Sequence, residues 1–296
     1  MNMENKAFTY TICQREKPCI CITKYELEEE EVIIPECIDQ KQVVEIGNYA
    51  FHGKQIKKVV LPHSLDTIGS HAFYDCRQLK EITFSDFLVE VADGAFKNCR
   101  NLHIMNIHIL QERYTCLKNL LSELNQQMLC RLYKRDQEVE LVFPAYAHNY
   151  QENTMARIIN QETYGAGAHY RETITKNGIL YKEYDSRFSF AKNVDETETL
   201  YAIVLSRLAF PYELGVEANK QYQMFLKEQY KKIVQWLIQT KQLERIQWLA
   251  QYEETTQEQI KEMLLQLQQA DAIELVSKVM QVNQQRFGQK KKTFSL

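Results

Sequence analysis

The feature that most constrains the fold of this chain is an internal repeat in its first third. The units "IGNYAFHGKQIKKVVLP", "IGSHAFYDCRQLKEITF" and "VADGAFKNCRNLHIMNI" begin at Ile46, Ile68 and Val91, so their starts lie 22 and 23 residues apart. A unit of this length cannot bury its own apolar side, and stacked copies must therefore share one core. The repeat predicts a short solenoid.

The repeat also predicts which side chains meet inside that solenoid. Each unit carries an Ala-Phe pair followed by a short run of alternating apolar residues. We expect Phe51, Phe73 and Phe96 to stack as a continuous aromatic spine. Cys76 and Cys99 occupy equivalent positions and are expected to form an inward ladder, which is a structural role rather than a reactive one.

The pattern "IGxxAFxxCxxLKxIxF" resembles the BspA-type leucine-rich repeat of bacteria, over about residues 8–108. The preceding "VIIPECIDQKQVVEI" is similar to the N-terminal entry of that family, with Val32 and Ile34 in the place of Val59 and Leu61. The resemblance implies a right-handed solenoid with a parallel sheet on one face. It also implies one further strand before the first full repeat.

The exposed face of that sheet is the first candidate site. If Val59, Ile82 and Met105 point inward, the neighbouring residues form two outward columns across the strands. Two interpretations remain open: a small mixed face that binds a protein or peptide, and a solvated sheet that stabilises itself. Four strands offer less than the ~800 Å² per partner of a standard interface. The candidate protein-binding residues are Lys58, Val60, Glu81, Thr83, Ile104 and Asn106.

The residues after the repeat predict an α+β middle unit. Apolar residues between Leu110 and Leu124 recur at helical spacing, which indicates a helix that covers the open end of the solenoid core. The repeat itself is expected to stop after Ile107. "LCRLYKRDQEVELVF" then predicts two strands around Arg135-Asp136-Gln137, ended by Pro144.

The stretch "YGAGAHYRETITKNGILYKEYD" holds a glycine cluster that could suggest a phosphate-binding loop. Such a loop needs a buried strand before its glycines and a helix after them, whereas "INQET" is polar and no Walker lysine follows. The Asn177-Gly178 pair instead predicts a second β-hairpin that pairs Ile174 with Tyr181 and Arg171 with Tyr184. Gly165 and Gly167 are then expected to allow a tight bend or a close backbone approach before its first strand.

Three basic residues near this stretch, Arg157, His169 and Arg171, form a possible anion-binding site. Their alternative role is to make salt bridges and hydrogen bonds within the fold. The segment from Tyr114 to Leu214 resembles an uncharacterised region that follows such repeats in some bacterial proteins, and this resemblance implies no activity.

The last third of the chain is expected to form α-helical hairpin repeats. Residues 233–253 match residues 260–280 at an offset of 27, and each copy predicts two short helices about a polar turn. The second copy, "ADAIELVSKVMQVN", resembles the second helix of ankyrin-like repeats, although the "TPLHxA" motif is absent. The expected fold class is therefore α+β. Its predicted domains are a repeat domain with an N-terminal cap at 1–109, the middle unit at 110–215 and the helical region at 216–296.

Composition excludes several classes of function. A net charge of −3 and a pI near 6.2 provide no basic stripe for nucleic acid. No run approaches the ~18 apolar residues that span a membrane, and no signal sequence is recognisable, so a cytoplasmic location is expected. The 8 cysteines lie between Cys13 and Cys130 and are expected to be free thiols. The spacing of His103 and His108 suits neither a strand nor a helix metal site.

No sequence motif indicates catalysis, because neither G-x-S-x-G nor H-E-x-x-H is present. We therefore expect a non-catalytic interaction or scaffold module that binds a protein or peptide partner through its solenoid surfaces, without a cofactor. The alternative is an enzyme of unknown class with a site in the middle unit around Arg157, His169 and Arg171. The oligomeric state is left open.

Overall fold

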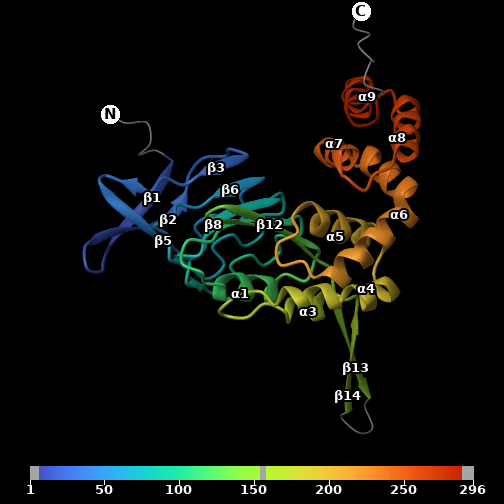
Figure 1. Ribbon diagram of the computed structural model, residues 1–296. Coiled ribbons are helices and arrows are strands. Elements are labelled where there is room, and N and C mark those ends of the chain that lie inside the picture. Colours follow the sequence, from blue (N-terminus) through green and yellow to red (C-terminus); the bar gives the residue numbers. More distant parts are fainter. Residues whose placement is uncertain (1–6, 154–157, 289–296) are drawn as a thin grey trace, which may run out of the picture. The chain divides into compact units, whose positions relative to one another are not determined.

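The computed structural model of the chain describes residues 7–153 and 158–288 and has a mixed α+β fold (Figure 1). The predicted fold class is thus confirmed. The chain divides into two compact units, one formed by Met1–Glu196 with Tyr212–Leu214 and the other by Thr197–Pro211 with Gly215–Leu296. The division into domains at 1–109, 110–215 and 216–296 stays a prediction.

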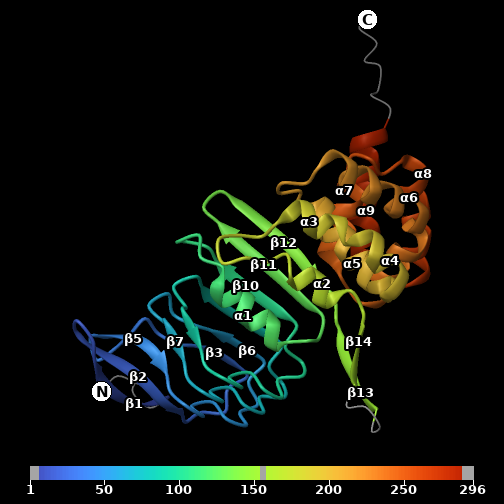
Figure 2. The same ribbon diagram turned by 90° about the horizontal axis from the view of Figure 1, so that it is seen from below.

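The solenoid of the first unit is built from two sheets, which Figure 2 shows stacked turn upon turn. The long sheet has the order β12-β11-β10-β8-β6-β3, in which all neighbours are parallel except β11 and β12. Its strands are β3 (Glu31–Ile33), β6 (Lys58–Val60), β8 (Glu81–Ser85), β10 (Ile104–His108), β11 (Met128–Lys134) and β12 (Gln137–Phe143).

The second sheet has the order β1-β2-β5-β7-β9, and β4 pairs with β5. It begins with an antiparallel hairpin of β1 and β2 and continues through parallel neighbours from β2 to β9. Its strands are β1 (Phe8–Gln14), β2 (Pro18–Tyr25), β4 (Cys37–Ile38), β5 (Lys41–Ile46), β7 (Thr67–Ile68) and β9 (Glu90–Val91). The pairing of β3 with β6 confirms the extra strand before the first full repeat.

The aromatic spine is confirmed inside the solenoid. The ring centroids of Phe51 and Phe73 lie 4.8 Å apart and those of Phe73 and Phe96 lie 5.1 Å apart, with all three side chains buried. The stack continues toward the N-terminus through Tyr25 and Phe8, with centroid separations of 5.1 and 5.4 Å. The hairpin of β1 and β2 therefore caps the same core that the repeats share.

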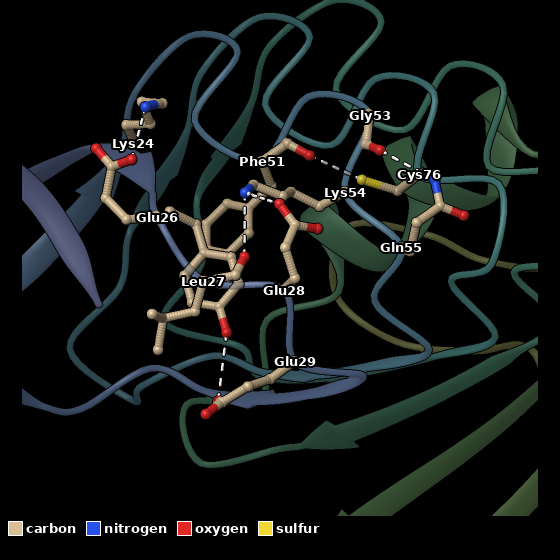
Figure 3. A network of polar contacts seen from close by, with 11 residues as sticks. Lys24, Glu26, Leu27, Glu28, Glu29, Phe51, Gly53, Lys54, Gln55 and Cys76 are labelled. Atoms are coloured by element: carbon tan, nitrogen blue, oxygen red, sulfur yellow. Dashed lines mark hydrogen bonds and ion pairs between the residues drawn. The ribbon is translucent and has the colours of Figure 1, made fainter. Parts of the chain in front are cut away.

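The cysteine ladder is also present and links each repeat to the previous one. The Sγ atoms of Cys76 and Cys99 donate to the carbonyl oxygens of Phe51 and Phe73, at 3.0 and 3.1 Å. The first full repeat has no such cysteine. Its largely buried Lys54 instead donates to the carbonyl oxygen of Leu27 at 3.0 Å and pairs with Glu28 at 2.6 Å (Figure 3). The ammonium group of Lys54 thus takes the place that the thiol of Cys76 or Cys99 has in the later repeats.

The end of the solenoid differs from the expectation in one respect. The predicted helix is α1 (Thr115–Glu123), which contacts β9 and buries Leu117 and Leu121, whereas Leu110 is exposed. The long sheet does not stop after Ile107, because β11 pairs with β10 in parallel and extends it by two strands. The predicted hairpin around residues 135–137 is confirmed, with Lys134 opposite Gln137.

The described residues of the segment that follows form one antiparallel strand pair and three short helices. The strands are β13 (Ala147–Asn153) and β14 (Ile158–Tyr164), which pair antiparallel. The helices are α2 (Gly167–Arg171), α3 (Tyr181–Ser186) and α4 (Phe188–Val194).

The predicted hairpin around Asn177-Gly178 is wrong. The dipeptide does form a turn, but only one bridge, Ile174 to Ile179, flanks it, and helices α2 and α3 replace the two strands. The two helices form because Tyr170 and Tyr184 bury fully on the core, which outweighs the strand preference of these residues.

The glycines at the start of α2 allow the close approach that was expected. A Cβ atom on Gly167 would collide with the main-chain oxygen of Pro144, and one on Gly165 would lie 2.5 Å from that of Ala145. The two glycines lead into a helix, however, and not into a strand.

The second unit consists of five helices among its described residues, and the expected hairpin repeats are present. They are α5 (Thr197–Ala209), α6 (Val216–Gln239), α7 (Leu243–Gln251), α8 (Gln257–Gln269) and α9 (Ile273–Phe287). The turns of the two hairpins match at Lys241 and Asp271, which both have positive φ, so the true offset is 30 residues (271 − 241) and not 27. The described helices include none that is both long and apolar enough to cross a membrane.

Candidate binding face of the solenoid

The predicted site residues lie together on the outer face of the long sheet. Val59, Ile82 and Met105 are buried and point into the solenoid. The outer face is formed by the residues that precede and follow them along each strand, whose side chains point the other way. The strand register places a first column on this face, which contains Glu31, Lys58, Glu81, Ile104, Leu129 and Val142. A second column contains Ile33, Val60, Thr83, Asn106, Arg131 and Glu140.

Four of the predicted residues form one polar network across three strands. The Nζ atom of Lys58 lies 2.9 Å from Oε1 of Glu81, and the Nδ2 atom of Asn106 donates to the same oxygen at 2.7 Å. Asn106 also donates to Oγ1 of Thr83 at 3.3 Å. The hydrogen bond to Glu81 raises the pKa of Lys58, which keeps the ammonium charged.

Most charges of this face are paired with each other, while Glu31 on the edge strand is exposed. Besides Lys58 and Glu81, the Nε atom of Arg131 lies 3.1 Å from Oε2 of Glu140, a residue that is only 2% exposed. In contrast, the Oδ1 atom of Asn106 is buried and has no hydrogen-bond partner in the described part of the chain. The face is therefore close to neutral, with one unused acceptor near its centre.

The most exposed apolar member of the face lies at its N-terminal edge. Ile33 is 74% exposed on the edge strand β3, while Val60 and Ile104 are half-buried. Asn106 in the same column as Ile33 is only 7% exposed. Accessible apolar surface is thus concentrated at one end, and hydrogen-bonding groups lie at the middle.

A row of rings at the carboxyl ends of the strands escaped the sequence analysis. The ring of His108 packs edge-on to His63, with centroids 5.3 Å apart, and stacks on Tyr133 at 5.2 Å. Burial and the neighbouring His63 lower the pKa of His108, which favours the neutral imidazole. The signal was available, because His108 lies two residues beyond Asn106 on the same side of the strand. Tyr133 was hidden because nothing in the sequence pairs β11 with β10.

A hollow of about 600 Å³ opens beside this row, between residues 109–112 and 134–137. The buried carboxylate of Asp86 orders its first wall. It accepts hydrogen bonds from the main-chain N–H groups of Leu110, Gln111 and Arg113, at 2.9, 2.7 and 3.2 Å. The hollow lies where β10 and β11 end, so it adjoins the carboxyl edge of the long sheet.

The possible anion-binding residues are not presented as one pocket. The Nε, Nη1 and Nη2 atoms of Arg171 donate five hydrogen bonds of 2.6 to 3.0 Å, which equals the number of guanidinium N–H groups. His169 is half-buried, pairs with Glu172 at 3.5 Å and packs against Phe190. Arg157 lies outside the described residues. Arg171 therefore has no donor left for an anion. The five acceptors of Arg171 are the carbonyl oxygens of Leu121, Leu124, Gln126, Pro144 and Gly167.

Comparison with known proteins places the repeats in a family. The description "BspA type Leucine rich repeat region" matches residues 40–123, in six copies. Residues 40–123 are a BspA-type leucine-rich-repeat region. Such solenoids typically bind proteins and are usually non-catalytic. No curated protein matches the chain significantly, and no cluster of three or more potential metal ligands occurs among the described residues.

Three solved bacterial structures are similar to one third of the chain. A leucine-rich-repeat protein of T. pallidum is 34% identical over 34% of this chain and 51% of its own, with a TM-score of 0.33. One from Bacteroides capillosus is 27% identical over 34% and 78%, with a TM-score of 0.32. A leucine-rich cell surface protein of Faecalibacterium prausnitzii is 22% identical over 34% and 35%, with a TM-score of 0.28. The matched region spans about half the length of the first of these.

Proposed function

We propose that the chain is a non-catalytic binding module whose leucine-rich repeats hold an extended peptide segment of a protein partner on the outer face of the long sheet. The side chains that β12 adds to the two columns, Glu140 and Val142, are buried, so five strands from β3 to β11 remain. At the usual spacing of about 4.8 Å they cover about 19 Å, which is the length of roughly six extended residues. That length suits a linear segment better than a folded surface, because standard protein interfaces are larger.

The observation that carries this proposal is the side chain of Asn106. Its Nδ2 group is used within the sheet, but its buried Oδ1 atom has no donor. A buried acceptor without a partner costs about 1–3 kcal/mol. A main-chain N–H of a bound segment would remove that cost once the side chain of Asn106 rotates and brings Oδ1 to the surface. The other five predicted residues surround it on the same face, namely Lys58, Val60, Glu81, Thr83 and Ile104.

The paired charges of the face indicate the chemistry of the segment. Lys58 and Arg131 already have carboxylate partners, so a charged ligand would have to displace an existing ion pair. We infer a mostly neutral segment with apolar side chains toward Ile33 and Val60 and a ring or methyl group toward His108 and Tyr133. Binding should then change little between low and high salt, because screening acts mainly on exposed, unpaired charges.

A selection from a random 12-residue peptide library tests the proposal. The full chain should enrich peptides that bind in fluorescence anisotropy, and the double variant Val60→Glu/Ile104→Glu should weaken them at least tenfold. Asn106→Ala should weaken them as well. The matched control is Val89→Glu, an equally apolar-to-acid change at an exposed residue outside the long sheet. Failure to enrich any peptide, or equal loss in the Val89 variant, would overturn the proposal.

This proposal makes no use of Arg157, His169 or Arg171, and the enzyme alternative gains no support from them. The expected absence of nucleic-acid and membrane partners and the cytoplasmic location stay predictions.

A further inference from the structure

Two cysteines face each other across the hairpin that caps the solenoid. Cys13 of β1 is directly opposite Cys19 of β2 in the antiparallel register. Their Sγ atoms lie 2.7 Å apart, and Cys19 also lies 3.3 Å from the carbonyl oxygen of Cys13. No disulfide joins the two cysteines in the structure.

The backbone already has the geometry that a cross-link between them requires. Directly opposed residues in an antiparallel pair have Cα atoms about 4.5 or 5.5 Å apart. A disulfide accepts Cα separations of about 4.4–6.8 Å, with its sulfurs at about 2.05 Å. Only side-chain rotation is therefore needed to bring the two Sγ atoms from contact to bonding distance.

A third thiol on the same face is engaged elsewhere. Cys21 lies two residues after Cys19 and is opposite Thr11. Burial raises the pKa of Cys21 to about 12, and Glu45 on β5 adds to this through its charge and a hydrogen bond. Cys21 therefore has its own polar neighbours, and Cys13 has Cys19.

We propose that Cys13 and Cys19 form a redox-sensitive cross-link of the N-terminal hairpin, made by exchange with a low-molecular-weight disulfide such as oxidised glutathione. The thiolate of the more exposed Cys13 attacks one sulfur of the oxidant, which forms a mixed disulfide and expels one glutathione thiolate. The thiolate of Cys19 then attacks the Cys13 sulfur, which forms the Cys13–Cys19 bond and expels the second. Two protein thiols lose two protons and two electrons, and the oxidant is reduced to two thiols.

The environment of Cys13 sets the speed of this reaction. Burial and the contact with Cys19 raise the pKa of Cys13 to about 11. The thiolate is the attacking species, so little of it is present at pH 7. The cross-linking rate should accordingly rise about tenfold per pH unit between pH 7 and 9. Such a pair responds to sustained oxidising conditions and not to brief ones.

The cross-link would act on a strand that has no other support in the sheet. β1 is the outermost strand and pairs only with β2 among the described residues. It also delivers Phe8, which stacks on Tyr25 at the end of the aromatic spine. A bond between Cys13 and Cys19 would tether β1 beside its turn and reduce opening of the cap. This inference is independent of the proposed peptide binding.

The experiment uses the full chain in glutathione buffers of increasing oxidised fraction, followed by denaturation and labelling with N-ethylmaleimide. The reduced chain has 8 cysteines and should take up eight labels, and the oxidised chain should take up six (8 − 2). Trypsin cuts after Arg15 but poorly at Lys17-Pro18, so a cross-linked pair of peptides 7–15 and 16–24 is expected. Detection of that pair by mass spectrometry in the wild-type chain needs no variant and supports the proposal.

The variants distinguish this pair from its neighbours. Cys21→Ser should keep the cross-linked peptides and fix the bond to Cys19, because 16–24 then holds one cysteine. Cys13→Ser and Cys19→Ser should each abolish the loss of two labels. Eight labels on the oxidised wild-type chain would overturn the proposal. Mapping of the bond to Cys21 or Cys37, or a persistent loss of two labels in Cys13→Ser, would do the same.

Discussion

The repeat region, residues 31–108, and the closing region, residues 109–196, achieve stability in different ways. In the repeats the same contact recurs, as in the stack of Phe51, Phe73 and Phe96 at about 5 Å. The closing region is held by single buried residues that each bind several of its main-chain groups, and one of these residues, Asp86, belongs to the repeat region. Arg171 donates to five carbonyls, and Asp86 accepts from three N–H groups. Recurring contacts distribute the stabilisation, whereas such hubs concentrate it.

The largest effect that we expect from this difference is at Arg171. Arg171→Met should lower the free energy of unfolding of the first unit by about 4–5 kcal/mol, because it leaves buried carbonyl oxygens without donors. Hydrogen exchange measured by mass spectrometry on peptides covering residues 117–126 would report this loss. Arg171→Lys, which retains three donors at most, should lose less. Arg135→Met in the exposed turn after β11 is the control and should change stability by under about 0.5 kcal/mol. A loss below about 1 kcal/mol for Arg171→Met would contradict the hub role.

The second largest effect should occur in the middle of the spine. Phe73 is fully buried and stacks on both sides, so Phe73→Ala should cost about 3–4 kcal/mol through lost burial and a cavity. Urea unfolding followed by the same hydrogen-exchange readout measures it. Phe87, which is 38% exposed, is the matched control and should lose under about 1 kcal/mol on truncation to alanine. If Phe73→Ala exposed only its own repeat to exchange, the repeats would not share one core.

The same difference decides what the sequence could predict. The two outward columns follow from the alternation around Val59, Ile82 and Met105. Each repeat has the same alternation, and the repeats stack in register, so the pattern of one strand predicts its neighbours on the next. The role of Arg171 does not follow from any pattern. Its partners are main-chain carbonyls between residues 121 and 167, and every residue type has a carbonyl group.

Local preference misled the prediction where tertiary burial was stronger. The Asn177-Gly178 turn exists, but Tyr181 and Tyr184 lie on a helix despite their preference for strands. Likewise, the alternation in β11 correctly predicted a strand, although it could not show that this strand joins β10. The candidate face was therefore predicted for four strands, whereas the sheet has six, of which β12 buries the side chains that it adds to the two columns.

A smaller effect is expected at the second hub, which joins the two regions. Asp86→Ala removes the acceptor for three main-chain N–H groups and should cost about 2 kcal/mol. Exchange should accelerate mainly at residues 110–113, where those groups lie. Asp86→Asn keeps one acceptor oxygen and should fall between the wild type and the alanine variant. Asp93→Ala, at an exposed residue, is the control. Equal exchange at residues 110–113 in the two alanine variants would contradict the stabilising role of Asp86.

The smallest effect tests whether β11 behaves as one more repeat strand. Burial and then His63 lower the pKa of His108 below its ordinary value of 6.5, so the unfolded chain takes up a proton more readily than the folded one. Stability from this residue is therefore present above about pH 6.5 and is lost as the pH falls from there through the lower, folded pKa.

NMR titration of the imidazole protons should give the lowered pKa of His108 directly. His63→Gln should raise the pKa of His108 by removing the neighbouring positive charge. Replacement of the stacked Tyr133 by alanine should raise it too, because more water would reach the ring. If the pKa of His108 is the same with and without the Tyr133 ring, the row of rings ends at β10. The binding face would then lose its fifth strand, β11.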